Sequence, residues 1–282
     1  MNLMHLNALY DLRSKLYVDG LIQPRKCENE NAALADMVDR SHIEGPVIII
    51  ADRNYECYNT FAHIEQKGWK YLIRVKDTDS SGILSELSLP SGGEFDICVK
   101  RILARKQTKE VKTHPEIYKI LECKSPFDFL DLFTFFYPIS FRIVRFKITA
   151  DSYETVITNL DKLDFPPSEL KALYHMRWGI ETSFRELKYA VGLANLHAKK
   201  VEYIGLAIFP AYLVADPAYL SVVRFFIVVV APAVFEGCRI EDKVTIEAAS
   251  VHVRTDDHLK AVAPHAPGKF PCGPRPASPR RA

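Results

Sequence analysis

The stretch Pro46-Val-Ile-Ile-Ile-Ala-Asp52-Arg-Asn-Tyr55 decides how this chain folds. Its apolar run is continuous rather than alternating, which predicts a strand buried on both faces of a sheet that helices cover. The run ends in Asp52, and ligands bind at the carboxyl ends of strands in open α/β sheets. Asp52 has a second interpretation, as the N-cap of a helix expected over residues 58–67. The residues alone leave both interpretations open.

Strands and helices alternate along the chain on both sides of this run. Before it we expect a hairpin over residues 5–12 and 16–22 and a helix over 29–40, and after it a strand over 70–76. This alternation predicts the α/β fold class. Beyond Asp77 the expected elements are short and β-like. They are expected over 94–99, 117–121, 127–137, 140–148 and 153–159.

A second informative pattern lies on a helix expected from about residue 168 to 188. Tyr174, Arg177, Glu181 and Lys188 follow one another at offsets of +3, +7 and +14 from the tyrosine. At 3.6 residues per turn these side chains fall within about a sixth of the helix circumference. An aromatic hydroxyl, two cations and a carboxylate therefore share one face. The alternative is a surface ion pair, since Arg177 and Glu181 stand at i,i+4 beside other charges.

Together, Asp52-Arg-Asn-Tyr and the string Tyr174-x2-Arg177-x3-Glu181-x6-Lys188 resemble the DDE transposases of the insertion-sequence 4 family. The resemblance extends from about Leu6 to Lys200 and includes Trp69-Lys-Tyr-Leu-Ile-Arg-Val-Lys-Asp77. It implies a ribonuclease-H-like core with a β-rich insertion, and a polynucleotidyl transferase that moves DNA by phosphodiester cleavage and strand transfer. It also implies Mg²⁺ or Mn²⁺ as cofactor, double-stranded transposon ends as partner, a homodimer, and a bacterial, cytoplasmic and nucleoid-associated location.

The resemblance assigns roles to individual residues. Asp52 matches the second and Glu181 the third of three metal-binding catalytic carboxylates. Arg177 and Tyr174 match binders of transposon-end phosphates, and Lys188 matches a residue that holds a backbone phosphate. Trp178 could stack on a DNA base, and its alternative is an ordinary core tryptophan.

The first carboxylate of the resembled family should lie on a strand before the hairpin at residues 5–22. The sequence starts at Met1, so this strand is expected to be missing, with unpaired edges left in the sheet. Asp11 and Asp19 are the acidic residues nearby, and neither stands in the first-strand position by order along the chain. We therefore expect an N-terminally truncated relic with impaired catalysis.

Four parts are expected along the chain. They are the first part of the core (1–76), the β-rich insertion (77–139), the second part of the core with the Tyr-Arg-Glu-Lys helix (140–203), and a divergent C-terminal region (204–282) whose last residues, 264–282, are rich in proline and expected to be disordered.

Composition narrows the alternatives. An apolar fraction of 48% supports a globular core, and the net charge of +2 is not that of a strong polyanion binder. Basic residues are locally dense around Arg74 and again near Lys112, which suits phosphate contact or an ordinary solvated face. The six cysteines form no metal-binding pair spacing. The apolar run 219–235 carries Arg224 and Pro232, so no membrane span is predicted.

Three functions remain for this sequence. The first is a DDE transposase with impaired catalysis. The second is a non-catalytic DNA-binding protein derived from a transposase. The third is an unrelated nuclease with a two-metal site, which would need a third acid from Asp11 or Asp19.

Overall fold

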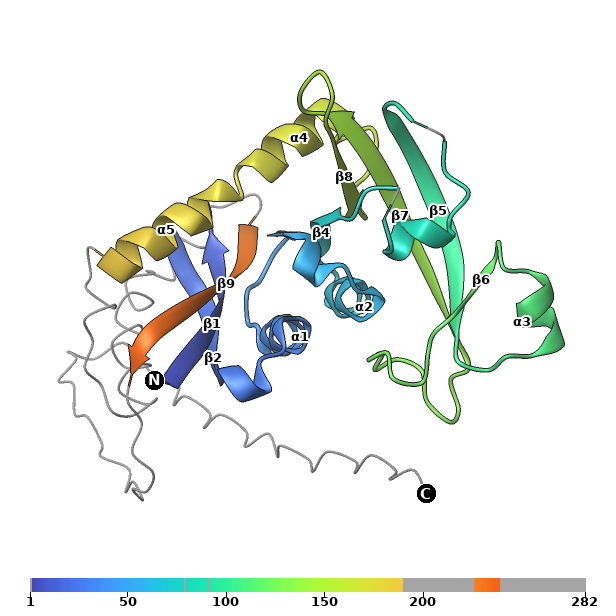
Figure 1. The fold of residues 1–282 in the computed structure, drawn as a ribbon, viewed down its shortest axis with the longest axis horizontal. Coiled ribbons are helices and arrows are strands. Elements are labelled where there is room, and N and C mark those ends of the chain that lie inside the picture. Colours follow the sequence, from blue (N-terminus) through green and yellow to red (C-terminus); the bar gives the residue numbers. More distant parts are fainter. Residues whose placement is uncertain (1, 79, 91, 190–225, 239–282) are drawn as a thin grey trace, which may run out of the picture. The chain divides into compact units, whose positions relative to one another are not determined.

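The computed structural model describes residues 2–78, 80–90, 92–189 and 226–238, and within them it forms one mixed sheet flanked by helices (Figure 1). The strands are β1 (Asn2–Asp11), β2 (Leu16–Pro24), β3 (Val47–Ala51), β4 (Lys70–Val75), β5 (Phe95–Ala104), β6 (Tyr118–Ile120), β7 (Phe136–Lys147), β8 (Tyr153–Thr158) and β9 (Phe226–Cys238). The helices are α1 (Glu30–Arg40), α2 (Tyr58–Gln66), α3 (Lys109–Thr113), α4 (Pro167–His175) and α5 (Trp178–Tyr189), with short 3₁₀ helices η1 (Arg25–Cys27), η2 (Arg53–Tyr55) and η3 (Ile83–Glu86). The strand order is β2-β1-β9-β3-β4-β8-β7-β5-β6.

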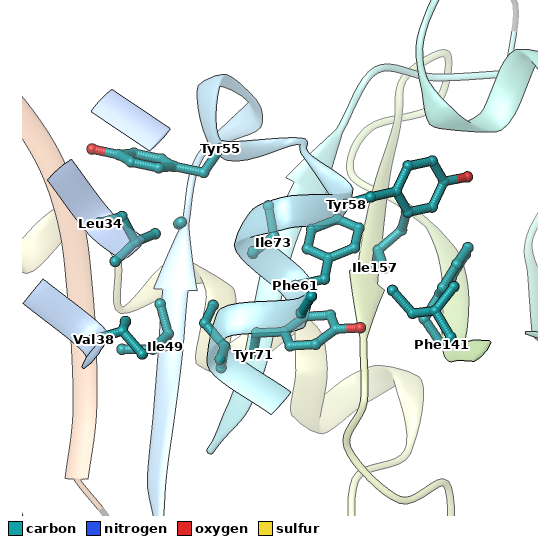
Figure 2. Close-up of a cluster of buried hydrophobic side chains, with 14 of the residues drawn as sticks. Leu34, Val38, Ile49, Tyr55, Tyr58, Phe61, Tyr71, Ile73, Phe141 and Ile157 are labelled. Atoms are coloured by element: carbon teal, nitrogen blue, oxygen red, sulfur yellow. The ribbon is translucent and has the colours of Figure 1, made fainter. Parts of the chain in front are cut away.

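Strand β3 is buried along its whole length, as its continuous apolar run predicts. Its residues alternate between the two faces of the sheet. Ile49 packs with the buried side chains of α1 and α2, as Figure 2 shows for Leu34 and Phe61. Ile48 and Ile50 belong to a second cluster on the other face, which includes residues of α4 and α5. Helices thus cover both faces at β3, and the α/β prediction is confirmed.

A strand that the sequence did not predict, β9, lies between β3 and β1. β9 pairs parallel to β3, with Val47 opposite Phe226 and Ala51 opposite Val230. On its other side it pairs antiparallel to β1 along most of that strand. In Figure 1, β9 (orange) runs beside β1 (blue). The expectation of a missing strand and an open sheet edge is therefore wrong for this position, because a C-terminal segment fills it and satisfies the backbone hydrogen bonds of both neighbours.

Local patterns predict most other elements. The hairpin β1–β2 is antiparallel, α1 begins after Asn29, whose side chain accepts a hydrogen bond from the backbone N–H of Ala32, and β7–β8 is antiparallel. The prediction of a strand over residues 127–137 is wrong except at its end, where β7 begins at Phe136. In that segment Asp131 accepts hydrogen bonds from the backbone N–H groups of Phe133 and Thr134, which makes a turn.

The parts expected along the chain share one sheet in the described structure. β5 and β6 of the predicted insertion continue the same sheet, and β7 runs across the boundary expected after residue 139. The division into these parts remains a prediction. The expected disorder of residues 264–282 lies outside the described residues.

Bidentate ion pairs join β7 to the strands and loops beside it. Arg142 binds Asp96 with bonds of 2.7 and 2.8 Å, and Arg145 binds Asp77 with two bonds of 2.8 Å. The Arg145 guanidinium, with the Thr155 hydroxyl, outweighs partial burial and lowers the pKa of Asp77 to about 2. These bonds tie the end of β4 to the β7–β8 hairpin.

A histidine joins α1, α2 and the loop before β7. His63 Nδ1 lies 2.9 Å from Asp39 Oδ1, and its Nε2 lies 2.9 Å from Asp128 Oδ2. Burial opposes the charged imidazolium, but the hydrogen bonds to Asp128 and Asp39 outweigh it and raise the pKa of His63. The doubly protonated ring can donate to both carboxylates, whereas the neutral ring can donate to only one.

Among the described residues, no helix is both long enough and apolar enough to cross a membrane.

A chain that ends at Phe225, just before β9, should lose cooperative unfolding. Removing β9 leaves the edges of β1 and β3 unpaired, at a cost that we expect to exceed a typical domain stability of about 5–15 kcal/mol. Circular dichroism during urea titration measures this. The matched control ends at Ile240 and keeps β9, and cooperative unfolding of both chains would contradict the assigned role of β9.

The contribution of His63 to stability should depend on pH. Because its folded pKa is raised, its stabilisation is complete below its unfolded pKa of about 6.5 and is lost as pH rises through the folded pKa. The difference in unfolding free energy between the wild type and His63→Gln should therefore shrink between pH 6 and pH 9. A difference that grows over this range would show that the neutral ring is the stabilising form.

Candidate functional site

Asp52 lies at the carboxyl end of β3, where the strand turns into η2. Its Oδ1 accepts a hydrogen bond of 2.9 Å from the backbone N–H of Asn54, so it caps η2, whereas Cys57 stands at the N-cap of α2. The sequence alternative of a cap on α2 is therefore wrong. Asp52 follows Ile48 and Ile50 in the alternation of β3, so its position lies on the face of the sheet that α4 and α5 cover.

The helix predicted over residues 168–188 is two helices. α4 ends at His175 and α5 begins at Trp178, and the turn between them has tight bonds from Arg177 N–H to the Tyr174 carbonyl and from Ile180 N–H to the Arg177 carbonyl. These i→i+3 bonds change the helical phase. The single-helix geometry behind the predicted common face is therefore wrong in detail.

Arg177 and Tyr174 nevertheless lie together at this turn. The guanidinium carbon of Arg177 lies 5.8 Å from the centre of the Tyr174 ring. Arg177 Nη1 donates a hydrogen bond of 2.6 Å to Glu181 Oε1, which is the predicted i,i+4 ion pair. Three of the four predicted residues thus form one cluster.

Two buried polar atoms of this cluster have no hydrogen-bond partner among the described residues. They are the hydroxyl of Tyr174, a side chain only 6% exposed, and Nε of Arg177. Burial raises the pKa of Tyr174 to about 12, against the opposing charge of Arg177, so the hydroxyl keeps its proton and can donate. Unsatisfied buried donors are costly and rare in folded proteins. These two donors are available to a hydrogen-bond acceptor such as a phosphate oxygen.

The charge of Asp52 acts on this cluster. Burial opposes the charged form of Arg177, but Tyr174, Glu181 and Asp52 outweigh it and raise the pKa of the guanidinium. The charge of Asp52 also adds to the raised pKa of Tyr174, after the larger effect of burial. The carboxyl end of β3 and the turn between α4 and α5 therefore form one electrostatic site.

The two remaining predicted residues, Trp178 and Lys188, both lie on α5. Trp178 is 59% exposed, so the alternative of a core tryptophan is wrong. The guanidinium of Arg177 lies 5.5 Å from its ring centre. Stacking of Trp178 on a base stays a prediction. Lys188 lies on α5, and its side chain is outside the described part of the structure.

Asp11 and Asp19, the acids near the start of the chain, are each bound by other residues. Asp11 is fully buried and accepts hydrogen bonds from the backbone of Arg13 and Ser14. Asp19 is held by Arg40 through bonds of 2.8 and 2.9 Å. Both carboxylates have partners in the hairpin or in its contact with α1, and among the described residues neither is grouped with two further potential metal ligands.

Sequence reasoning missed Glu30, an acid near Asp52. It lies in the first turn of α1, and burial followed by the charge of Asp52 raises its pKa. Its Oε1 lies 3.6 Å from His5 Nε2. The sequence shows Glu30 only as an acid directly after the helix cap at Asn29. An acid at that position is usually explained by its favourable interaction with the helix dipole.

A cavity of about 450 Å³ opens at the carboxyl end of β4, the strand next to β3. Its charged lining residues are the cations Arg53, Arg74 and Lys76 and the acids Asp77 and Glu154, and Tyr153 of β8 also lines it. Arg74 pairs with Glu154 at 3.0 Å, whereas Arg53 is exposed and makes no ion pair with the described residues. Parallel neighbours end at the same edge of a sheet, so this cavity lies on the edge that carries Asp52.

The available donors do not fit a pair of divalent ions. Two such ions need several carboxylate oxygens, but the acids whose charges act on Arg177 are Asp52 and Glu181, and Glu181 is already bonded to that guanidinium. Across the described residues, no three Asp, Glu, His or Cys side chains are grouped so that they could hold a metal ion.

Comparison with known proteins agrees with the resemblance of the motifs. A comparison with curated proteins gave no match. The profile of the family described as "Transposase DDE domain" matches residues 2–214, which include Asp52, Arg177 and Glu181. That match covers well over half of the sequence, and this chain therefore belongs to the transposase DDE domain family.

Proposed function

We propose that this chain binds double-stranded DNA with the surface formed by the α4–α5 turn and the carboxyl ends of β3 and β4, and that it cleaves DNA poorly or not at all. The observation that carries the proposal is the pair of buried, unpartnered donors on Tyr174 and Arg177. A transposase of the insertion-sequence 4 type would place a phosphate of the transposon end there. The string from Tyr174 to Lys188 supports that type.

The arrangement of the sheet supports a ribonuclease-H-like core. The order β2-β1-β9-β3-β4 places an antiparallel hairpin on one side of a central strand and two parallel strands on the other. In this assignment β9 stands where the resembled family has its first strand. The homodimer and the bacterial, nucleoid-associated location remain predictions from the resemblance.

Positive charge around the site suits a DNA backbone. Arg177 would donate to one phosphate, and Arg53, Arg74 and Lys76 line a cavity at the same edge of the sheet. Phosphate contacts of this kind position a duplex without reading its sequence. We therefore expect affinity with little dependence on base sequence and a strong dependence on salt.

Cleavage is proposed to be impaired because of the carboxylates. Mg²⁺ or Mn²⁺ is the cofactor that the resemblance implies, with Asp52 and Glu181 as ligands. With two acids, one of them bonded to Arg177, the donor set falls short of a two-ion site. The second candidate, a DNA-binding protein without any catalysis, follows if these two acids hold no ion at all.

Arg177→Gln should weaken binding to a duplex by roughly tenfold at low salt, since it removes a phosphate contact worth about 1.4 kcal/mol. The slope of log K against log salt should fall by about 0.9. Fluorescence anisotropy with a labelled duplex measures both quantities. Lys112→Gln is the matched control, because it removes one positive charge from α3, which packs on β6 at the far edge of the sheet. Equal losses for the two variants would mean diffuse attraction rather than a defined site.

The wild-type chain should not nick supercoiled plasmid above background in Mg²⁺ or Mn²⁺. Asp52→Ala and Glu181→Ala should leave this background unchanged, because neither acid completes a reactive site. Gel electrophoresis of the plasmid forms gives the readout. Nicking that both substitutions abolish would show that these acids still support catalysis.

A further inference from the structure

The central strand of the sheet carries no acid at the level of Asp52. β9 runs parallel to β3, and the last pair of the ladder is Ala51 with Val230. One residue further along both strands stand Asp52 and Ala231. Residues at the same level of neighbouring strands lie on the same face of a sheet, so position 231 shares the face of Asp52.

The pairing of β1 leads to the same placement. Ala8 stands opposite Ala231 across the antiparallel ladder. Ala8 is buried in the cluster that includes Tyr174 of α4 and Ile180 of α5. Position 231 is therefore on the face of the sheet that α4 and α5 cover, and Glu181 follows Ile180 on α5.

The acid of β9 itself lies too far along the strand. Glu236 comes five residues after Ala231, which at about 3.3 Å per residue is roughly 16 Å. Pro232 follows Ala231 directly and lacks a backbone N–H. It lies beyond Val230, the last residue of β9 that pairs with β3, and stands opposite Asn7 of β1.

We infer that β9 supplies the sheet with its central strand without supplying the site with its third carboxylate, and that position 231 is where an acid would complete a divalent-cation site with Asp52 and Glu181. This inference rests on the proposed roles of those two acids. The backbone hydrogen bonds between β1 and β3 need only a strand between them, whatever its side chains are. Cation binding needs an oxygen ligand at one register position.

The test is a calorimetric titration of Mn²⁺ into the wild type, Ala231→Asp and Ala231→Asn, without DNA. The aspartate variant should bind at least about tenfold more tightly than the wild type, since it adds a charged oxygen ligand beside Asp52. The asparagine variant has the same shape without the charge and should resemble the wild type. Adding Asp52→Asn to Ala231→Asp should abolish the gain.

Equal binding by the folded wild type and Ala231→Asp would overturn the inference, and so would a gain that survives the loss of Asp52. If Ala231→Asp does not fold, the inference is tested by comparing Mn²⁺ binding by the wild type and by Asp52→Asn. Asp52-dependent binding at micromolar Mn²⁺ would then show a site that is complete without position 231, whereas equal weak binding would support the inference. DNA affinity, measured without metal, tests the proposed function separately.

Discussion

The structure depends on the need of β3 for a hydrogen-bonded neighbour on each of its edges. Both faces of β3 are buried, so water cannot replace a missing strand. β4 serves one edge and β9 the other. The position of Asp52 follows from β3, and α5 packs against β9. The carboxylate and the Arg177 cluster therefore come together only because the central slot is filled.

How much of this was predictable depends on the range of each interaction. β3, α1 and the hairpin β1–β2 follow from patterns within a dozen residues, and the Arg177–Glu181 pair follows from one helical turn. The place of β9 does not follow from its residues, because an apolar run carries no information about which distant strands it joins. Pro232 counted against a membrane span in this run and gave no indication of its place in the sheet.

The same limit applies within the candidate site. The break between α4 and α5 cannot be seen in helical periodicity, and it is accompanied by a close approach to the hairpin. A β-carbon at Gly179 would lie 2.6 Å from Leu12 Cδ2, the far end of a side chain, so a larger residue there would displace Leu12. The unpartnered donors of Tyr174 and Arg177 are likewise properties of packing. Spacing predicted which residues meet, and the fold determined which of their atoms remain available.

The late arrival of β9 has a consequence for synthesis of the chain. Leu9 pairs with Val230, a separation of roughly 220 positions. A ribosome that adds about 5–20 residues per second needs at least several seconds between these two points. During that time β1 and β3 can form, but each has one edge without a neighbouring strand. Such unpaired edges, made of mostly apolar residues, can pair with strands of other molecules. The yield of folded protein should therefore be governed by protection of the nascent chain rather than by the stability of the finished sheet.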